Sequence, residues 1–459
     1  MKKENSAQKM GTMPVGKLLM SMALPAMCSM LVQSLYNIVD SIFVARLSED
    51  ALTAVSLAFP MQMLILSFSL GASVGANSLI ARRLGEGRLQ EASAAANNGF
   101  FLALVNYILF LLGGLLIARP FISLFSEDAA MVEMGTQYLS IVMIFSFGMH
   151  IAGMGEKVLQ ATGNMIIPMI TQLIGAILNI ILDPIMIFGL LGFPALGIAG
   201  AAIATVTGQI AAAIYVMVML LIREHAVHIQ LKGFRLDGGA IRDILKVGVP
   251  TAVMNAIGSV TTTGMNKILM SYSSTAVAVI GAYFKLQSFV FMPVFGLTQG
   301  LMPILGYNYG ANNRKRFMHA LKLAFAVALG IMTVGTLLFN LIPDKLLMLF
   351  EAGPEMQRIG QAALRTISYC FIGAAFGIII STMFQAIGYG LQSLLMSLLR
   401  QLVLILPVAW LLGRLWGLDA VWFAYPIAEY TCLAVFLPVG VCVIKKEFSK
   451  KAQLQGEGN

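Results

Sequence analysis

Charged side chains are scarce in this chain of 459 residues, where they make up 11% of the total. A soluble domain carries about 25%. Hydrophobic residues reach 58%, which is too apolar for a soluble protein of this length. The apolar runs are continuous, as over residues 102–117, and lack the alternation of barrel strands. We therefore expect an all-α integral membrane protein.

Cysteine and histidine are also rare, with four of each in the chain. All four cysteines lie inside apolar runs, so we expect neither a disulfide framework nor a zinc site. The sequence shows no metal-ligand cluster, no Cys/His pair and no nucleophile motif. These absences argue against a membrane-embedded enzyme and against a bound cofactor. The cysteines are Cys28, Cys370, Cys432 and Cys442.

The apolar runs form about twelve segments long enough to cross a hydrocarbon core, which takes roughly 20 helical residues. Six lie in each half of the chain. We expect transmembrane helices near residues 17–46, 51–82, 93–118, 131–155, 165–190, 196–222, 245–270, 276–306, 317–341, 358–385, 391–414 and 419–443.

The second half of the chain repeats the first, 225 positions later. Pro25 recurs as Pro250 and Gly75 as Gly300, in a register that holds without a gap from about residue 24 to residue 163. Six spans per half is an even number, so the copies are parallel and related by an axis along the membrane normal. Such repeats are typical of secondary transporters that work by alternating access.

The repeat predicts two pseudo-symmetric six-helix bundles. We place the N-terminal lobe at residues 1–228, a polar and basic cytoplasmic linker at 229–243, and the C-terminal lobe at 244–459. One polypeptide would then enclose its own cavity, so a monomer would suffice for function.

The net charge of +9 reflects membrane topology and not nucleic-acid binding. Most Lys and Arg residues fall in the two tails and in the loops on one side, for example at Arg82, Arg83 and residues 314–316. Cytoplasmic loops carry such an excess of positive charge. We therefore expect both termini to be cytoplasmic, with the lipid bilayer and small molecules as partners.

Two aspartates interrupt spanning helices. An Asp at the centre of such a helix costs about 2.5–3.5 kcal/mol on insertion scales. Tyr36 lies four residues before Asp40, and Asn179 lies four residues before Asp183. Residues four apart share a helix face, so each carboxylate has a polar neighbour. In the second copy Met265 replaces Asp40, so one lobe carries acidic groups that the other lacks.

Two carboxylates close together in a low dielectric cannot both ionise easily, so we expect at least one to hold a proton near neutral pH. Such a pair could couple proton release to a conformational change. Coordination of Na⁺ by the same oxygens is an alternative. A third interpretation is structural, with each Asp simply hydrogen bonding to a neighbouring helix.

Other ionisable residues inside spans are less decisive. Glu156 and Lys157 are predicted to form a local ion pair at the inner interface, and Glu156 could alternatively attract cations that arrive from the cytoplasm. Lys285 could cap or pair with a group in the C-terminal lobe, and Glu429 could be a secondary cation site or a hydrogen-bonding group. His150 could relay protons, but a lone histidine on an apolar face is more often structural.

Four separated motifs show that the chain resembles the multidrug and toxic compound extrusion (MATE) transporters, most of all the MepA-type and DinF-type branches. The resemblance covers nearly the whole chain. The motifs are ALPAMCSMLVQSLYNIVDSIFVARL at 23–47, LQATGN at 159–164, LNIILDP at 178–184 and GIAGAAIAT at 197–205.

The resemblance implies roles for particular residues. Asp40 matches the central proton-linked group of the family's first span, and Pro25 matches the proline at which that helix bends. A polar network with Asp40 is implied for Tyr36, Asn179, Asp183 and Thr205. The acidic residues that another branch uses in the seventh and tenth spans are absent here, which favours coupling through the N-terminal lobe.

These expectations combine into one functional hypothesis. The chain would export amphipathic organic cations across a bacterial inner membrane in exchange for protons. The alternatives are a sodium-coupled exporter of the same family and a flippase for lipid-linked precursors. A flippase usually needs several basic residues in its cavity, and only Lys285 and Arg400 lie deep within the predicted spans.

Overall fold

The computed structural model describes residues 8–223, 225–229, 234–350 and 352–456. For residues 37, 38, 40–42, 45, 49 and 454–456 it describes the backbone alone. The described part of the chain folds into helices without any strand, as expected from the continuous apolar runs. Ten helices are long and apolar enough to span a membrane, and up to twelve spans result if each of two bent pairs counts as one.

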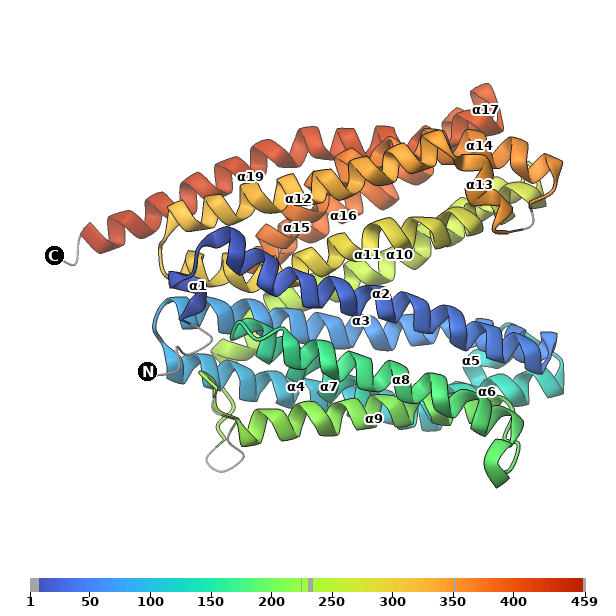
Figure 1. The fold of residues 1–459 in the computed structure, drawn as a ribbon, viewed down its shortest axis with the longest axis horizontal. Helices are drawn as coiled ribbons and strands as arrows, with labels where there is room; N and C mark the ends of the chain where they lie inside the picture. The colour runs from blue at the N-terminus through green and yellow to red at the C-terminus, as the bar shows by residue number, and fades with distance from the viewer. Residues whose placement is uncertain (1–7, 224, 230–233, 351, 457–459) are drawn as a thin grey trace.

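The N-terminal half contains α1 to α9 (Figure 1). The short helices α1 (Lys9–Thr12) and α5 (Ala118–Ser123) lie at the ends of the bundle. The long helices are α2 (Val15–Leu47), α3 (Glu49–Gly85), α4 (Leu89–Leu116), α6 (Ala129–Ile144), α7 (Phe147–Ala161), α8 (Ile166–Phe188) and α9 (Ile198–Ile222).

The C-terminal half repeats this arrangement. Its helices are α10 (Gly238–Met270), α11 (Ser274–Gly310), α12 (Arg314–Leu341), α13 (Pro343–Met348), α14 (Pro354–Ser368), α15 (Cys370–Ala386), α16 (Gly390–Leu398), the π-helical segment η2 (Leu399–Ile405), α17 (Leu406–Trp416), α18 (Leu418–Val421) and α19 (Ala424–Gly456). The predicted linker at 229–243 is shorter in the structure, because Asp237 caps α10 from Gly238 onward. The division into lobes itself stays a prediction.

Two spans that the sequence predicts as single runs are broken. The fourth span bends by 43° between α6 and α7, and the tenth bends by 45° between α14 and α15. The breaks fall at Phe145–Ser146 and at Tyr369, equivalent places in the two repeats. Hydropathy could not reveal them, since the apolar run continues through each break.

The two halves of the chain, which we call the N-terminal and C-terminal lobes, meet through α2 against α11 and α3 against α10. Glycines make the approach close: a Cβ on Gly71 would lie 2.6 Å from the Gly248 carbonyl oxygen, and one on Gly300 would lie 2.8 Å from the Ala23 nitrogen. The first contact joins the second half of α3 to the first half of α10, and the second joins the second half of α11 to the first half of α2. In Figure 1, α2 and α11 run side by side near the chain termini and diverge towards the other end.

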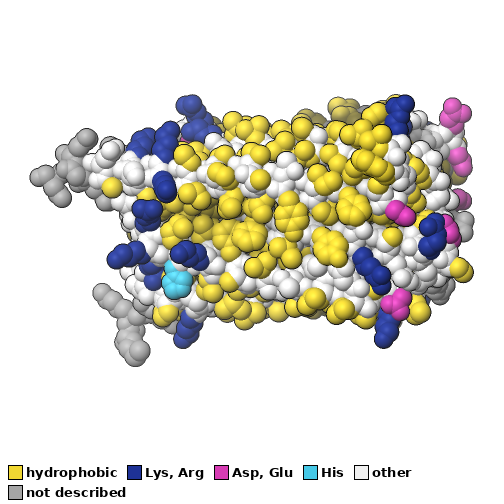
Figure 2. All heavy atoms as spheres, turned by 90° about the horizontal axis from the view of Figure 1, so that it is seen from above, with side chains coloured by type: hydrophobic (Ala, Val, Ile, Leu, Met, Phe, Trp, Pro, Cys, Tyr) yellow, Lys and Arg dark blue, Asp and Glu magenta, His cyan; other side chains and the backbone are white. Residues whose placement is uncertain are grey.

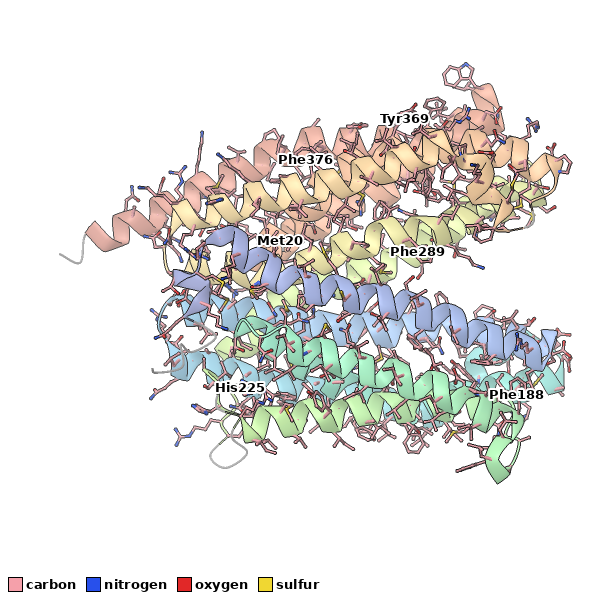
Figure 3. The ribbon with its side chains drawn as sticks, in the orientation of Figure 1. Met20, Phe188, His225, Phe289, Tyr369 and Phe376 are labelled. Carbon is pink, nitrogen blue, oxygen red and sulfur yellow. The ribbon has the colours of Figure 1, made fainter. Side chains whose placement is uncertain are left out.

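The outer surface has the character of a membrane protein. Figure 2 shows a broad hydrophobic band between two charged ends, with many Lys and Arg side chains at the end that holds the termini and Asp and Glu together with fewer Lys and Arg at the opposite end. His225, just after α9, and Phe188, the last residue of α8, mark these two ends in Figure 3. We call them the terminal end and the far end.

The C-terminal helix α19 is pinned at the terminal end. Tyr309 Oη donates to Glu447 Oε2 at 2.5 Å, and Tyr389 Oη donates to Glu447 Oε1 at 2.6 Å. Lys451 Nζ donates to the Tyr309 carbonyl oxygen at 2.5 Å and lies 3.7 Å from the centre of the Tyr309 ring. One carboxylate thus ties α19 to α11 and to the turn before α16.

Candidate substrate and ion site

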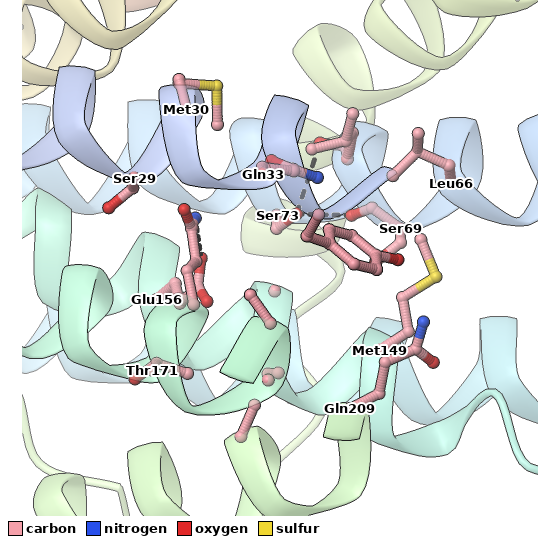
Figure 4. Close-up of a pocket in the computed structure, with 18 of the residues that line it drawn as sticks. Ser29, Met30, Gln33, Leu66, Ser69, Ser73, Met149, Glu156, Thr171 and Gln209 are labelled. Carbon is pink, nitrogen blue, oxygen red and sulfur yellow. Dashed lines mark hydrogen bonds between the residues drawn. The ribbon is translucent and has the colours of Figure 1, made fainter. Parts of the chain in front are cut away.

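A cavity of about 230 Å³ lies within the N-terminal lobe and reaches the interface between the lobes (Figure 4). Helices α2, α3, α7, α8 and α9 line it, and Gln299 of α11 closes it from the other lobe. Its lining combines apolar surface with amides and hydroxyls. The polar residues are Ser29, Gln33, Tyr36, Ser69, Ser73, Glu156, Lys157, Thr171, Gln172, Asn179, Thr205, Gln209 and Gln299.

Three predicted site residues come together on α8 and α9. Asn179 Nδ2 donates to Asp183 Oδ1 at 3.3 Å and to Thr205 Oγ1 at 3.2 Å. Asn179 and Thr205 line the cavity, while Asp183 lies one turn further along α8 with an exposed fraction of 0%. The helical spacing of the sequence therefore predicted this contact between Asn179 and Asp183 correctly, and the structure adds the bridge to α9.

The helix around Asp183 is locally weakened. Pro184 lies inside α8 and has no backbone N–H, so the Ile180 carbonyl loses its usual helical partner. The helix therefore lacks one backbone hydrogen bond beside the buried Asp183, and it can bend at this position more easily than elsewhere.

Asp40 lies near the end of α2, but its side chain is outside the described part of the structure. The predicted meeting of the Asp40 and Asp183 carboxylates therefore remains a prediction. Tyr36, one turn earlier on α2, lines the cavity. Pro25 lies inside α2, which continues as one helix through it, and its role as a hinge also remains a prediction.

Glu156 and Lys157 do not form the local ion pair that their adjacent positions suggest. Gln172 Nε2 donates to Glu156 Oε2 at 2.8 Å, whereas Lys157 Nζ donates to Gln160 Oε1 at 2.8 Å and to Gln299 Oε1 at 3.0 Å. Adjacent residues on a helix diverge by about 100°, so the two side chains reach different neighbours. Each has an exposed fraction of 9%, which places both in the cavity and not at an interface.

Few features of the sequence indicate the glutamines that complete the site. Gln160 Nε2 donates to Gln299 Oε1 at 3.1 Å, so the α7 cluster joins the two lobes directly. The available signal was the repeat, in which Gln160 recurs as Gln385. The residue type alone is uninformative in an apolar helix, because an amide can serve any polar partner.

Buried acceptors give the cavity its chemical preference. Asn179 Oδ1 and Gln172 Oε1 are buried without a hydrogen-bond partner among the described residues. An amide oxygen only accepts, so these two atoms and the Glu156 carboxylate suit protonated or cationic groups. Lys157 balances the charge of Glu156 in the lining, so the preference for hydrogen-bond donors and cations rests on the unpaired amide oxygens.

The remaining ionisable residues lie elsewhere. Lys285 is exposed on α11, with its Nζ 6.0 Å from the centre of the Phe350 ring. His150 is buried against Phe110, and neither ring nitrogen has a hydrogen-bond partner in the described chain. This geometry offers His150 no relay partner there. Glu429 forms an ion pair with Arg400 at 3.3 Å.

Within the described residues, no group of three or more His, Cys, Asp or Glu side chains is placed to hold a metal ion. A site for Na⁺ at Asp40 and Asp183 would also involve the Asp40 side chain, so it stays a prediction. The observed arrangement is one of hydrogen-bonded acids and amides around a cavity in the N-terminal lobe.

Comparisons with known proteins agree with this architecture. The MatE family model matches residues 25–185 and 250–411, once in each repeat. The chain is 26% identical over 420 residues to the FAD transporter of Shewanella oneidensis, covering 91% of this chain and 92% of that protein. It is also 26% identical over 429 residues to the multidrug export protein MepA of Staphylococcus aureus, covering 93% and 94%.

Solved structures show the same fold. A multidrug resistance MATE family transporter of the MOP superfamily in an outward-facing conformation matches with a TM-score of 0.92 and 26% identity, over 97% of this chain and 99% of that one. A MOP superfamily transporter from Pyrococcus furiosus matches with a TM-score of 0.91. The two family matches together cover most of the chain. This chain belongs to the MatE family, and it is a multi-pass membrane transporter and not an enzyme.

Proposed function

We propose that this transporter exports amphipathic organic cations in exchange for protons, using the cavity of the N-terminal lobe. The observation that carries the proposal is the buried Asp183, hydrogen bonded to the cavity residue Asn179. A carboxyl group shielded from solvent inside a membrane is neutral at lower cost than ionised. Proton binding there and cation binding in the cavity would then oppose each other.

The arrangement of the lobes supports alternating access. They pack through glycines at the terminal end and diverge towards the far end (Figure 1). We place the terminal end in the cytoplasm, because Lys and Arg concentrate there (Figure 2). The structure would then correspond to an outward-facing state, in a bacterial inner membrane and as a monomer.

Proton release would reset the transporter after the drug leaves. With Asp183 and Asp40 protonated, the cavity has less negative charge and holds a cation weakly. Deprotonation on the cytoplasmic side restores attraction for the next cation. The cycle requires that the protonated and deprotonated transporter bind the organic cation with different affinities. A coupling free energy of about 1–3 kcal/mol corresponds to a change of about 5–150-fold in that affinity.

Separate ion gradients test the proposal. Purified protein in liposomes is given an inward proton gradient or an inward Na⁺ gradient, and ethidium export is measured by fluorescence. We expect export with the proton gradient alone. Export driven by Na⁺ alone would show sodium coupling instead, and no export under either gradient would contradict the proposal.

A second class of substrate follows from one relative. The FAD transporter carries a molecule with anionic phosphates, so substrates with negative groups fall within reach of this fold. In the present chain the position of Arg400 favours such a substrate, because its guanidinium lines a polar cavity in the C-terminal lobe.

A further inference from the structure

The C-terminal lobe contains its own polar cavity, of about 340 Å³. Helices α10, α11, α15, α16 and the π-helical segment η2 line it. The lining combines hydroxyl and amide groups with apolar surface, to which the aromatic side chain of Phe295 contributes. Its polar residues are Thr251, Asn255, Thr298, Ser381, Thr382, Gln385, Ser393, Ser397, Arg400 and Gln401.

This cavity is the repeat counterpart of the cavity in the N-terminal lobe. With the 225-residue offset, Ser73 corresponds to Thr298 and Gly153 to Ile378, and all four line their respective cavities. The same offset fits α8 onto α16, η2 and α17. These two cavities therefore lie at equivalent positions of the two lobes.

The charges of the two cavities differ at equivalent positions. Glu156 and Lys157 correspond to the uncharged Ser381 and Thr382. Gly175, which has no side chain, corresponds to Arg400. The acidic side chain of the first cavity is thus removed in the second, and a guanidinium is added.

Arg400 is only partly satisfied by the protein. Its Nη1 lies 3.4 Å from Glu429 Oε1 and 3.3 Å from Glu429 Oε2, which is long for a charge-assisted hydrogen bond. Nε and Nη2 have no hydrogen-bond partner among the described residues, and 26% of the side chain is exposed, against 8% for Glu429. Donors of a guanidinium suit a planar oxyanion in a two-point contact.

The backbone is arranged around this pair. The segment η2 is π-helical from Leu399 to Ile405, and single widened turns of this kind often occur at functional sites. On α15, a Cβ on Gly373 would lie 2.8 Å from Glu429 Cγ and one on Gly377 would lie 2.8 Å from Glu429 Oε1. The glycines leave room for the Glu429 side chain. Its position beside Arg400 therefore depends on three elements, which are α15, η2 and α19.

We propose that the cavity of the C-terminal lobe binds an oxyanion group of an amphiphilic ligand, such as a sulfonate, carboxylate or phosphate, through Arg400. Hydroxyls and amides of the lining complete the contact, and Phe295 receives the apolar part. Glu429 acts as an internal competitor, because its carboxylate occupies Nη1 and repels a second anion. The inference rests on the transporter function but not on the direction or ion of coupling.

Competition with Glu429 makes anion binding depend on pH. An anion beside Glu429 favours the protonated carboxyl, so binding strengthens as the pH falls. The other titratable groups that interact with Glu429 are Cys370 of α15, Tyr283 of α11, and Tyr430 and Cys432 of α19 itself, and Tyr425 lies one turn earlier on α19. These thiols and phenols are neutral in their ordinary range, which leaves Arg400 as the permanent charge among these described groups.

Calorimetric binding of 1-naphthalenesulfonate to the purified full-length protein tests the proposal, because this sulfonate stays ionised at all working pH values. The neutral 1-naphthalenemethanol separates anion recognition from apolar partitioning. We expect Glu429→Gln to bind the sulfonate at least about tenfold more tightly, which corresponds to one recovered charge-assisted hydrogen bond. The pH dependence should disappear in the same variant.

The double variant Arg400→Gln/Glu429→Gln removes the pair without leaving an unpaired buried charge. Its affinity for the sulfonate should fall to that for the neutral alcohol. Arg400→Lys should retain part of the wild-type affinity for the sulfonate. Binding that is unchanged in the double variant overturns the proposal, as does a sulfonate that binds wild type at pH 6 no better than the alcohol. Ethidium export in the same variants reports on the transport function separately.

Discussion

At the residue scale, chemistry depends on a few polar groups in an apolar lobe. The sequence predicted the contact of Asn179 with Asp183, because helical spacing fixes which residues share a face. It misassigned Glu156 and Lys157, since neighbours in sequence point in different directions on a helix. Partners such as Gln172 and Gln299 depend on tertiary packing, which spacing within one helix does not determine.

Asp183→Asn should abolish the response of export to a proton gradient. The amide keeps the shape and the hydrogen bond to Asn179 but cannot exchange a proton. We expect ethidium export under an inward proton gradient to fall by about 5–150-fold, the range of a typical coupling free energy. Proteoliposome fluorescence measures the rate.

Glu133→Gln serves as the matched control for Asp183→Asn, because this exposed carboxyl lies on α6 of the same lobe but outside the cavity. Its export rate should equal that of wild type. An equal loss in both variants would show that the effect of Asp183→Asn is not specific to the buried acid.

Glu156→Gln should weaken binding of cations without abolishing proton coupling. The variant removes negative charge from the cavity while Gln172 keeps a hydrogen-bond partner. We expect the Kd for ethidium to rise by about tenfold, which corresponds to about 1.4 kcal/mol, one partly buried charge contact. Fluorescence anisotropy measures it, and an unchanged Kd would place the cation elsewhere.

At the element scale, the helices follow hydropathy closely, but their interruptions do not. The spans near 131–155 and 358–385 are each broken by more than 40°, although neither break contains proline. The π-helical turn at Leu399–Ile405 was also invisible in the sequence. Such features depend on what each helix packs against, and apolar composition says nothing about that.

The anchor of α19 gives a stability prediction. Burial, followed by the hydrogen bond to Glu447, raises the pKa of Tyr389 to about 12. Because this pKa is above the ordinary value of about 10, the neutral phenol and its hydrogen bond contribute fully to the free energy of unfolding below about pH 10. The contribution is lost as the pH rises through 12. Tyr389→Phe should therefore lower the free energy of unfolding by about 1–2 kcal/mol, equally at about pH 7 and about pH 9.

Thermal unfolding in detergent measures that loss, with Tyr369→Phe as the control. Tyr369 is an exposed tyrosine at the break between α14 and α15 (Figure 3). Its replacement should leave the Tm unchanged. If Tyr389→Phe also left the Tm unchanged, the contact with Glu447 would have no energetic role.

At the scale of the whole molecule, the repeat predicted two similar lobes. The distribution of Lys and Arg along the sequence predicted that one end of the molecule is rich in positive charge. The offset that relates Gly75 to Gly300 also relates the two cavities, which the sequence alone could not locate. Which end of the molecule closes could not be derived either, because the sequence is the same in every conformational state. That information lies only in the contacts between lobes.

Gly300→Val tests how the lobes close. A Cβ there would lie 2.8 Å from the Ala23 nitrogen of the opposite lobe, so the larger side chain should separate the lobes at the terminal end. Overpacking of this kind costs about 1–3 kcal/mol. Distances between spin labels on α2 and α11 should lengthen at the terminal end. Gly281→Val on the same helix is the control, because a Cβ there meets no atom within 4 Å.

The most direct test of proton–drug competition is proton release on drug binding. Ethidium is added to purified protein in weakly buffered solution, and a pH indicator reports the protons released per molecule bound. We expect wild type to release protons on binding ethidium and Asp183→Asn to release clearly fewer. Ethidium binding with no proton release by wild type, between about pH 6 and about pH 8, would contradict it.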